Sequence, residues 1–133
     1  MIHLDTSFLV HALGHGTEEA TQLTRWLKAG GDFGMSTIVW AEFMCGPLDA
    51  DEEAFARALV PEPSPLSGLD AELGAGLFNA TGRRRGSLND CLVAATAIRA
   101  EASLATSNPN DFQRFVPHGL KLAFPPIPRR GAR

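Results

Sequence analysis

Short apolar runs that predict β-strands alternate along this chain with longer segments whose apolar residues recur at helical spacing. The predicted strands lie at residues 2–4, 33–35, 104–106 and 120–124. The clearest predicted helix runs from Leu88 to Ala100. Strands that alternate with helices are typical of a mostly parallel central sheet flanked by helices, so we expect an α/β fold.

The composition is that of one ordinary globular domain. Of the 133 residues, 44% are hydrophobic and 20% are charged, which is enough apolar material for a single core. We expect residues 1–124 to form the domain and residues 125–133 to form a basic, proline-rich tail. The net charge of -3 excludes a general attraction to nucleic acid, so any such binding needs local basic patches or metal ions.

The cysteines and the N-terminus indicate the compartment. Cys45 and Cys91 lie in apolar helical patterns without a Cys-x-x-Cys spacing, so we expect two core thiols in a reducing environment. The first residues lack the basic region and the apolar run of a signal peptide. No apolar run reaches the roughly 18 residues that a membrane span needs. We therefore expect a cytoplasmic protein that does not associate with membranes.

A lone carboxylate, Asp5, ends the first predicted strand and precedes an apolar helix. Open α/β sheets place their ligand sites at the carboxyl ends of strands. Asn108 and Asp111 follow another short strand, so we expect them at the same edge of the sheet. Helix capping is the simpler alternative, because Asp5 or Asn108 can cap the next helix and Asp111 suits a first helical turn.

Two further acids lie within predicted helices. Glu42 is the only charged residue between Asp32 and Asp49, and its neighbours are apolar nearly all round the helix, so we expect that helix to be mostly buried. A carboxylate there should be protonated, ion-paired or bound to a cation, unless it lies at a narrow polar edge. Asp90 has only small residues on its own face, but Ser87 to Asp90 also has the spacing of a capping box.

Several carboxylates at one cleft repel one another, and a cation that prefers oxygen ligands relieves that repulsion. The sequence has no cluster of histidine or cysteine that suits zinc, and its four histidines share no spacing typical of a site. Magnesium or manganese is therefore the expected metal. The arginines at positions 83–85 are typical of a solvated loop, although they precede the helix of Asp90 and are placed to meet a phosphate backbone.

Four short motifs resemble those of the PIN-domain ribonucleases, and most closely those of the VapC-type toxins of bacterial toxin–antitoxin pairs. The motifs are Leu4-Asp5-Thr6-Ser7, Ala41-Glu42-Phe43, Asn89-Asp90-Cys91-Leu92-Val93-Ala94-Ala95-Thr96-Ala97 and Ala105-Thr106-Ser107-Asn108-Pro109-Asn110-Asp111-Phe112. Their order and spacing make the combination specific, and the resemblance spans nearly the whole chain. It implies a PIN-like fold whose catalytic and metal-binding acids are Asp5, Glu42, Asp90 and Asp111. It also implies Asn108 as a further metal ligand and Thr6 in a supporting role.

The resemblance implies a chemistry and a set of partners. RNA phosphodiesters would be hydrolysed with Mg²⁺ or Mn²⁺, leaving a 5′-phosphate and a 3′-hydroxyl. The protein would be the toxin of a type II toxin–antitoxin system, usually a homodimer, restrained by a VapB-like antitoxin whose helical segment lies in a groove beside the site. Position 108 is an amide where many relatives have an aspartate, so a second metal ion is expected to bind more weakly.

Three alternatives remain open on the sequence alone. The first is a catalytically weak metal- or RNA-binding PIN module that acts through its antitoxin complex, which turnover with Mg²⁺ or Mn²⁺ would distinguish. The second is a housekeeping PIN nuclease in RNA processing, or a relative that acts on DNA. The third is an aspartyl-phosphate hydrolase, for which Asp5 fits but the expected second aspartate is replaced by Ser7.

Overall fold

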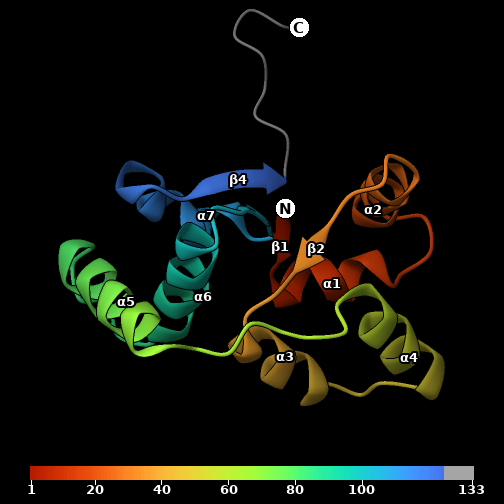
Figure 1. The fold of residues 1–133 in the computed structure, drawn as a ribbon, viewed down its shortest axis with the longest axis horizontal. Coiled ribbons are helices and arrows are strands. Elements are labelled where there is room, and N and C mark those ends of the chain that lie inside the picture. The colour runs from red at the N-terminus through yellow and green to blue at the C-terminus, as the bar shows by residue number, and fades with distance from the viewer. Residues whose placement is uncertain (125–133) are drawn as a thin grey trace, which may run out of the picture.

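The computed structural model describes residues 1–124. Four short strands form one sheet in the order β2-β1-β3-β4, and each neighbouring pair is parallel (Figure 1). They are β1 (Ile2–Leu4), β2 (Phe33–Gly34), β3 (Ser103–Ala105) and β4 (Lys121–Phe124). The expected α/β fold with a mostly parallel sheet is confirmed. The expected tail, residues 125–133, lies outside the described residues, so the domain boundary stays a prediction.

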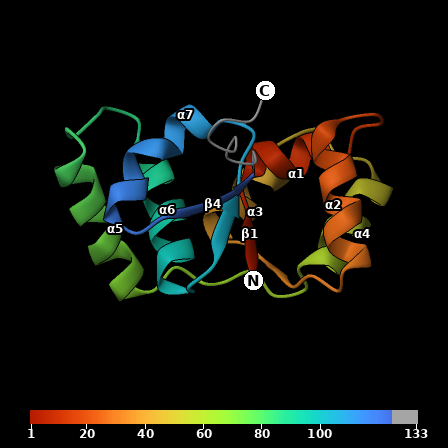
Figure 2. The same ribbon diagram turned by 90° about the horizontal axis from the view of Figure 1, so that it is seen from above.

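Seven α-helices and one 3₁₀-helix surround the sheet within residues 1–124. They are α1 (Thr6–Ala12), α2 (Glu18–Lys28), α3 (Thr37–Met44), α4 (Ala50–Leu59), α5 (Gly68–Ala80), α6 (Leu88–Arg99), α7 (Pro109–Phe112) and η1 (Gln113–His118). Figure 2 shows α5, α6 and α7 on one side of the sheet and α1, α2 and α4 on the other. None of these helices has the length and apolar character needed to cross a membrane.

Local signals in the sequence set several helix boundaries. Thr17, Ser36, Asp49 and Ser67 each accept a hydrogen bond from a backbone N–H in the first turn of the helix that follows. Such a bond satisfies one of the N–H groups that have no partner within the helix. The helices α2, α3, α4 and α5 therefore begin where the sequence supplies a capping side chain.

The core lies between the sheet and the helices on each of its sides. The ring centroid of Phe8 in α1 lies 5.6 Å from that of Trp26 and 5.1 Å from that of Phe124, which joins α1, α2 and β4. On the other side, α5 packs against α6 at Gly74, where a Cβ atom would lie 2.7 Å from the side chain of Leu92. The absence of a side chain at Gly74 lets the two helices approach closely. This packing holds α6, and with it Asp90, against the sheet.

Two expectations from the sequence are wrong. The helix α3 is not buried on most faces, because only Val39 and Phe43 are buried, whereas Glu42 and Met44 are exposed. Ile38 and Trp40 are half-buried against the core, whereas Ala41 and Met44 lie at the surface on the side of the helix that carries Glu42. Cys45, expected in the core, is exposed at the end of α3, whereas Cys91 is buried as expected.

The parallel register brings two strand ends together. Leu4 of β1 pairs with Ala105 of β3, and the backbone N–H of Asp5 donates to the carbonyl oxygen of Ala105 at 2.9 Å. The N–H of Thr106 donates in turn to the carbonyl oxygen of Phe124 in β4 at 3.2 Å. Asp5 and Thr106, which are 101 positions apart in the sequence, therefore lie side by side at the carboxyl edge of the sheet.

Candidate functional site

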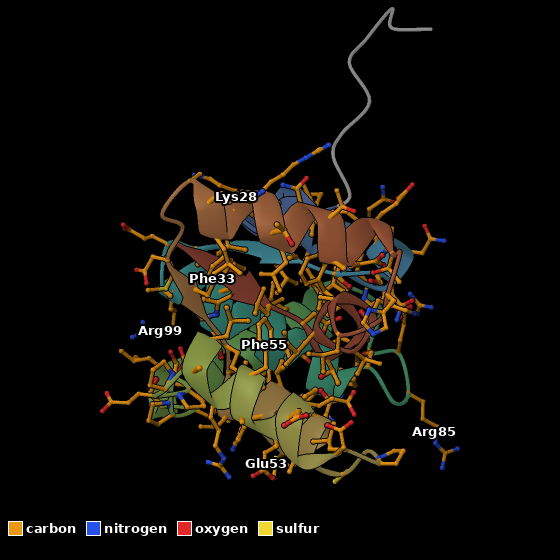
Figure 3. The ribbon with its side chains drawn as sticks, turned by 90° about the vertical axis from the view of Figure 1, so that its right-hand side faces the viewer. Lys28, Phe33, Glu53, Phe55, Arg85 and Arg99 are labelled. Atoms are coloured by element: carbon orange, nitrogen blue, oxygen red, sulfur yellow. The ribbon has the colours of Figure 1, made fainter. Side chains whose placement is uncertain are left out.

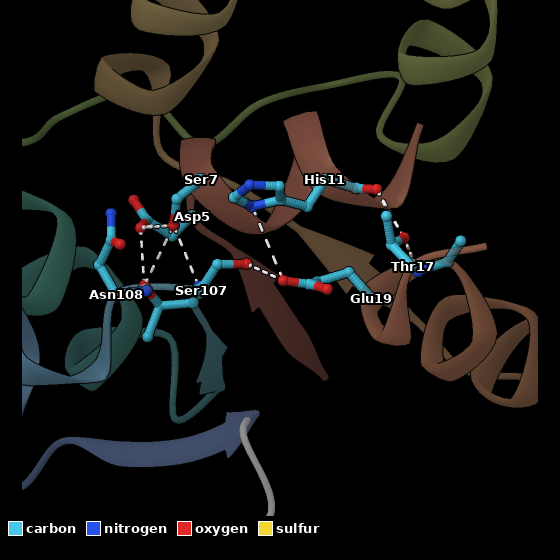
Figure 4. Close-up of polar contacts among 9 residues, drawn as sticks. Asp5, Ser7, His11, Thr17, Glu19, Ser107 and Asn108 are labelled. Atoms are coloured by element: carbon cyan, nitrogen blue, oxygen red, sulfur yellow. Dashed lines mark hydrogen bonds and ion pairs between the residues drawn. The ribbon is translucent and has the colours of Figure 1, made fainter. Parts of the chain in front are cut away.

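Asp5 is the most enclosed carboxylate at this edge, with 6% of its surface exposed. Its Oδ2 accepts hydrogen bonds from the hydroxyls of Ser7 and Thr106, each at 2.9 Å (Figure 4). Burial raises the pKa of the Asp5 carboxyl, and the two hydroxyl donors oppose that shift by stabilising the ionised form. These two donors also fix the orientation of the carboxylate at the end of β1.

A network of hydroxyl groups joins the ends of β1 and β3. The hydroxyl of Thr106 accepts a hydrogen bond from the backbone N–H of Asn108, and that of Ser7 accepts one from the N–H of Ser107, each at 3.0 Å. Figure 4 shows the side chain of Asn108 beside Asp5. Sequence reasoning selected Asn108 but missed Ser7 and Thr106 as site residues. The available signal was a hydroxyl residue within three positions of each strand end, Ser7 after Leu4 and Thr106 after Ala105.

A second contact ties the loop after β3 to the helices α1 and α2. The hydroxyl of Ser107 donates to Oε2 of Glu19, and Nδ1 of His11 lies 3.6 Å from the same oxygen (Figure 4). Glu19 belongs to the first turn of α2, and His11 belongs to the last turn of α1. His11, to which the sequence assigned no site, therefore supports the loop that carries Asn108.

Glu42 approaches the same edge from α3. It is exposed, and its Oε1 accepts a hydrogen bond from the hydroxyl of Thr6 at 3.0 Å. Thr6 directly follows Asp5, so this bond holds the Glu42 carboxylate near the end of β1. The cost of burial that the sequence suggested for Glu42 does not arise, because α3 leaves this position open to solvent.

Asp90, in the first turn of α6, is influenced by the negative charges of the other three acids. Its pKa is raised to about 6, first by burial and then by the negative charges of Asp111, Asp5 and Glu42. The guanidinium of Arg114 partly offsets this rise, and its Nη2 lies 4.0 Å from Oδ2 of Asp90. Because water and salt weaken the interaction between distant charges, these contributions indicate that the four acids lie near one another.

Helix capping does not explain these acids. The side chain of Asp5 makes no capping hydrogen bond to α1, and Asn108 makes none to α7. Ser87 precedes α6 but does not cap it, so the capping box proposed for Ser87 and Asp90 is absent. Asp90 and Asp111 do lie in first helical turns, where the helix dipole favours a negative charge. The helix dipole therefore favours an acid at each of these two positions, but it does not explain why the four acids lie close together.

The chemistry of these side chains suits a hard divalent cation. Four carboxylates offer only oxygen, which Mg²⁺ and Mn²⁺ prefer, and the raised pKa of Asp90 reflects a repulsion that such an ion relieves. Within residues 1–124, no three acidic, histidine or cysteine side chains already lie close enough to enclose an ion. Glu42 and Asp111 are exposed, and exposed side chains change rotamer rapidly, so both can move toward Asp5 and Asp90.

Thr106→Val is expected to raise the pKa of Asp5 further and to lower the free energy of unfolding by about 1 kcal/mol. Valine keeps the shape of threonine but lacks the hydroxyl that donates to Asp5 and accepts from Asn108. NMR titration of the Asp5 carboxyl and denaturant unfolding measure the two effects. Thr96→Val is the matched control, because Thr96 is also buried but its hydroxyl donates to the carbonyl oxygen of Leu92 within α6. An unchanged Asp5 pKa in Thr106→Val would contradict the assigned contact.

Comparisons with known proteins indicate the family to which this chain is related. The sequence matches the PIN domain over residues 2–116, and no curated protein matches it. VapBC2 from Rickettsia felis, solved bound to a DNA fragment from its promoter, has a chain with 23% identity and a TM-score of 0.70, covering 92% of this chain and 97% of that chain. FitAcB from Neisseria gonorrhoeae has 19% identity and a TM-score of 0.65, covering 92% and 96%. A toxin–antitoxin complex from Klebsiella pneumoniae has 26% identity and a TM-score of 0.62, covering 84% and 90%.

The matched region contains the features that define the candidate site. Residues 2–116 include β1, β2 and β3 with all the α-helices of the described chain. They also include the four acids whose charges influence one another near the carboxyl edge of the sheet, Asp5, Glu42, Asp90 and Asp111. Because the match covers most of the sequence and the solved neighbours share the fold, this chain belongs to the PIN domain family.

Proposed function

We propose that this protein is a metal-dependent endoribonuclease that acts as the toxin of a type II toxin–antitoxin pair. The observation that carries the proposal is the convergence of four acids, Asp5, Glu42, Asp90 and Asp111, at the carboxyl edge of a PIN domain. The likeness to VapBC and FitAcB structures supports the role of a toxin restrained by a VapB-like antitoxin. The motif resemblance to VapC-type toxins supports a homodimer.

The residues that would hold Mg²⁺ or Mn²⁺ are Asp5, Glu42, Asp90, Asp111 and Asn108. A bound ion of this kind polarises a phosphate and lowers the pKa of a coordinated water. The protein contributes placement, because two hydroxyl donors hold Asp5 rigidly while Glu42 is tethered only by Thr6. Asn108 offers a neutral amide oxygen in place of a carboxylate, so a second ion would be held more weakly.

Cleavage of total cellular RNA by purified protein without its partner tests the proposal. We expect discrete cuts with Mg²⁺ or Mn²⁺ and none with EDTA, and the mapped ends should carry a 5′-phosphate and a 3′-hydroxyl. A folded, metal-loaded protein that makes no cuts would favour the catalytically weak module that acts through an antitoxin complex. Growth arrest on expression alone, relieved by an antitoxin from an adjacent gene, separates a toxin from a housekeeping nuclease.

The antitoxin is proposed to lie between α1 and α4. A cavity of about 320 Å³ there is lined by Leu13 and Phe55 together with Asp51 and Glu52. Phe55 is 40% exposed, and Val10 of α1 is 51% exposed, so both helices offer apolar surface to one face of an amphipathic helix. Asp51 and Glu52 at the rim suit basic side chains of that partner.

Phe55→Asp is expected to weaken antitoxin binding about 10- to 100-fold, because it replaces an apolar anchor at the groove with a charge beside two acids. Figure 3 shows Phe55 on α4. Isothermal titration calorimetry with the cognate antitoxin measures the effect. Leu69→Asp is the matched control, since Leu69 is 56% exposed on α5 at the other side of the sheet. Equal effects of the two changes, or no effect of Phe55→Asp, would place the antitoxin elsewhere.

A further inference from the structure

The polar cavity beside Asp90 has more basic than acidic side chains in its wall. It has a volume of about 170 Å³, and Arg84, Arg85 and Arg114 line it together with Asp90 and Asp111. Because the two aspartates are proposed metal ligands, a bound cation would leave the three guanidinium groups without an opposing charge. The three arginines outnumber the two aspartates even without a metal ion, so the cavity is suited to an anion in the metal-free protein, and a bound cation would increase that preference.

Arg114 is the most constrained of the three arginines. Its side chain is 15% exposed, and its guanidinium carbon lies 4.5 Å from the ring centroid of Phe115. Its closest carboxylate contact, to Asp90, is 4.0 Å long, which exceeds hydrogen-bond distance. Its Nε is buried and has no hydrogen-bond partner among residues 1–124. A guanidinium held in this way retains N–H groups for phosphate oxygens, which it binds as a planar fork.

Arg84 and Arg85 belong to the loop between α5 and α6. Within the described chain, neither side chain forms an ion pair or a hydrogen bond. Figure 3 shows the side chain of Arg85 extended into solvent, and an exposed side chain changes rotamer rapidly, so its guanidinium can turn toward an anion at the cavity. Arg83 in the same loop differs, because its Nη1 donates to Oδ1 of Asn79 at 2.9 Å and its guanidinium lies over the ring of Phe78. The loop thus presents two free guanidinium groups and one that is occupied.

The same loop leaves the start of α6 uncapped at the cavity. The hydroxyl of Ser87 donates to the carbonyl oxygen of Arg84 at 2.7 Å instead of accepting from the first turn of the helix. Gly86 and Ser87 both line the cavity. Uncapped N–H groups and the positive end of the helix dipole add to the preference for an anion that the arginines establish.

From these contacts we propose that the cavity formed by Arg84, Arg85, Ser87 and Arg114 binds a phosphate group of the RNA strand, next to the phosphodiester that is cleaved. This inference rests on the proposed ribonuclease function. Phosphate contacts set the position of a nucleic acid strand without reading its bases. The arginines therefore determine which linkage reaches the four acids, and base preference arises elsewhere.

Binding of a short, fluorescent, single-stranded RNA to the full chain in EDTA tests the arginines while the RNA stays intact. Arg85→Gln and Arg114→Gln are each expected to weaken binding about fivefold and to reduce the slope of log Kd against log salt by about 0.7, the value for one phosphate contact on a single strand. Arg83→Gln, the matched control in the same loop, is expected to leave the slope unchanged. Arg114→Lys keeps the charge and should retain most of the slope while losing affinity.

A neutral methylphosphonate placed at one linkage at a time locates the bound phosphate. We expect that the modification weakens binding to the wild-type protein at one linkage, adjacent to the cut mapped with Mg²⁺, and that the loss equals the loss caused by Arg114→Gln. The two losses should not add when variant and modified RNA are combined, because both remove the same contact. Additive losses, or a critical linkage distant from the cut, would overturn the inference.

Two other outcomes also overturn it. If Arg85→Gln and Arg114→Gln leave both the affinity and the salt slope unchanged, the cavity is not a phosphate site. If Arg83→Gln weakens RNA binding as much as the other two variants, RNA is attracted by positive charge in general and not by this cavity. Arg85 is an exposed loop residue, so Arg85→Gln carries the test if Arg114→Gln fails to fold. RNA cleavage with Mg²⁺ is measured separately, so a wild-type protein that binds RNA through these arginines without cutting it contradicts the ribonuclease proposal alone.

Discussion

Asp5→Asn is expected to lower RNA cleavage with Mg²⁺ or Mn²⁺ by a factor of about 1,000 and to abolish growth arrest, while the protein stays folded. Asparagine has nearly the shape of aspartate and keeps an oxygen that accepts from Ser7 and Thr106. It lacks the negative charge that a metal ion needs. Because burial raises the pKa of Asp5, removing its charge relieves a desolvation cost and does not threaten the fold.

The measurement compares cleavage rates and thermal unfolding of wild-type and variant proteins. Asp32→Asn is the matched control, since Asp32 is an exposed aspartate that precedes β2 at the opposite, amino edge of the sheet. It is expected to cleave like the wild type. If Asp5→Asn retained cleavage, Asp5 would not be a metal ligand, and the assignment of the site to this edge would be wrong.

The elements that the sequence predicted best depend on local signals. The helix predicted from Leu88 to Ala100 is α6 (Leu88–Arg99), and its boundaries follow from apolar spacing in one continuous segment. Thr17 and Ser36 directly precede helices and cap them with their hydroxyl groups, which is a signal that the sequence carries locally. The strand ends that carry Asp5 and Asn108 were placed at one edge because parallel strands share a direction. These predictions required no knowledge of distant contacts.

The features that the sequence did not predict depend on which segments meet in space. Glu42 lies in an apolar segment, yet it is exposed because α3 packs along one side only. The bond from Thr106 to Asp5 depends on the register of strands that lie far apart in the chain. The approach of Arg114 to Asp90 likewise depends on how the segment after α7 packs against α6. Apolar spacing carries no information on such contacts.

Asp90→Asn is expected to have two effects of opposite sign, a loss of cleavage of about 1,000-fold and a gain in stability of the metal-free protein at neutral pH. The gain follows from the pKa of Asp90, which is raised from 3.8 to about 6 in the folded state. Such a shift corresponds to at most about 3 kcal/mol. Because 37% of the side chain is exposed and solvent screens its charge, we expect about 1 kcal/mol.

The dependence on pH distinguishes this effect from a change in packing. Below pH 3.8 both the folded and the unfolded chains bind the proton, so Asp90 contributes no penalty. Between pH 3.8 and about 6 the unfolded chain releases its proton first, so the free energy of unfolding of the wild type falls as pH rises. Asparagine does not titrate, so the gain in Asp90→Asn should grow across this window and stay constant above it.

Denaturant unfolding at several pH values, in EDTA and with Mg²⁺, measures the gain. With Mg²⁺ the wild type should recover the lost stability, because an ion that binds only the folded chain stabilises it, whereas the variant should respond less. The lost contact with Arg114, at 4.0 Å, is too long to offset the gain. An equal gain at pH 4 and pH 7 would contradict a charge effect. A gain in stability that is confined to higher pH and cancelled by Mg²⁺ would show that the wild type is destabilised by repulsion among the four carboxylates. The same repulsion makes the four carboxylates suitable ligands for a metal ion.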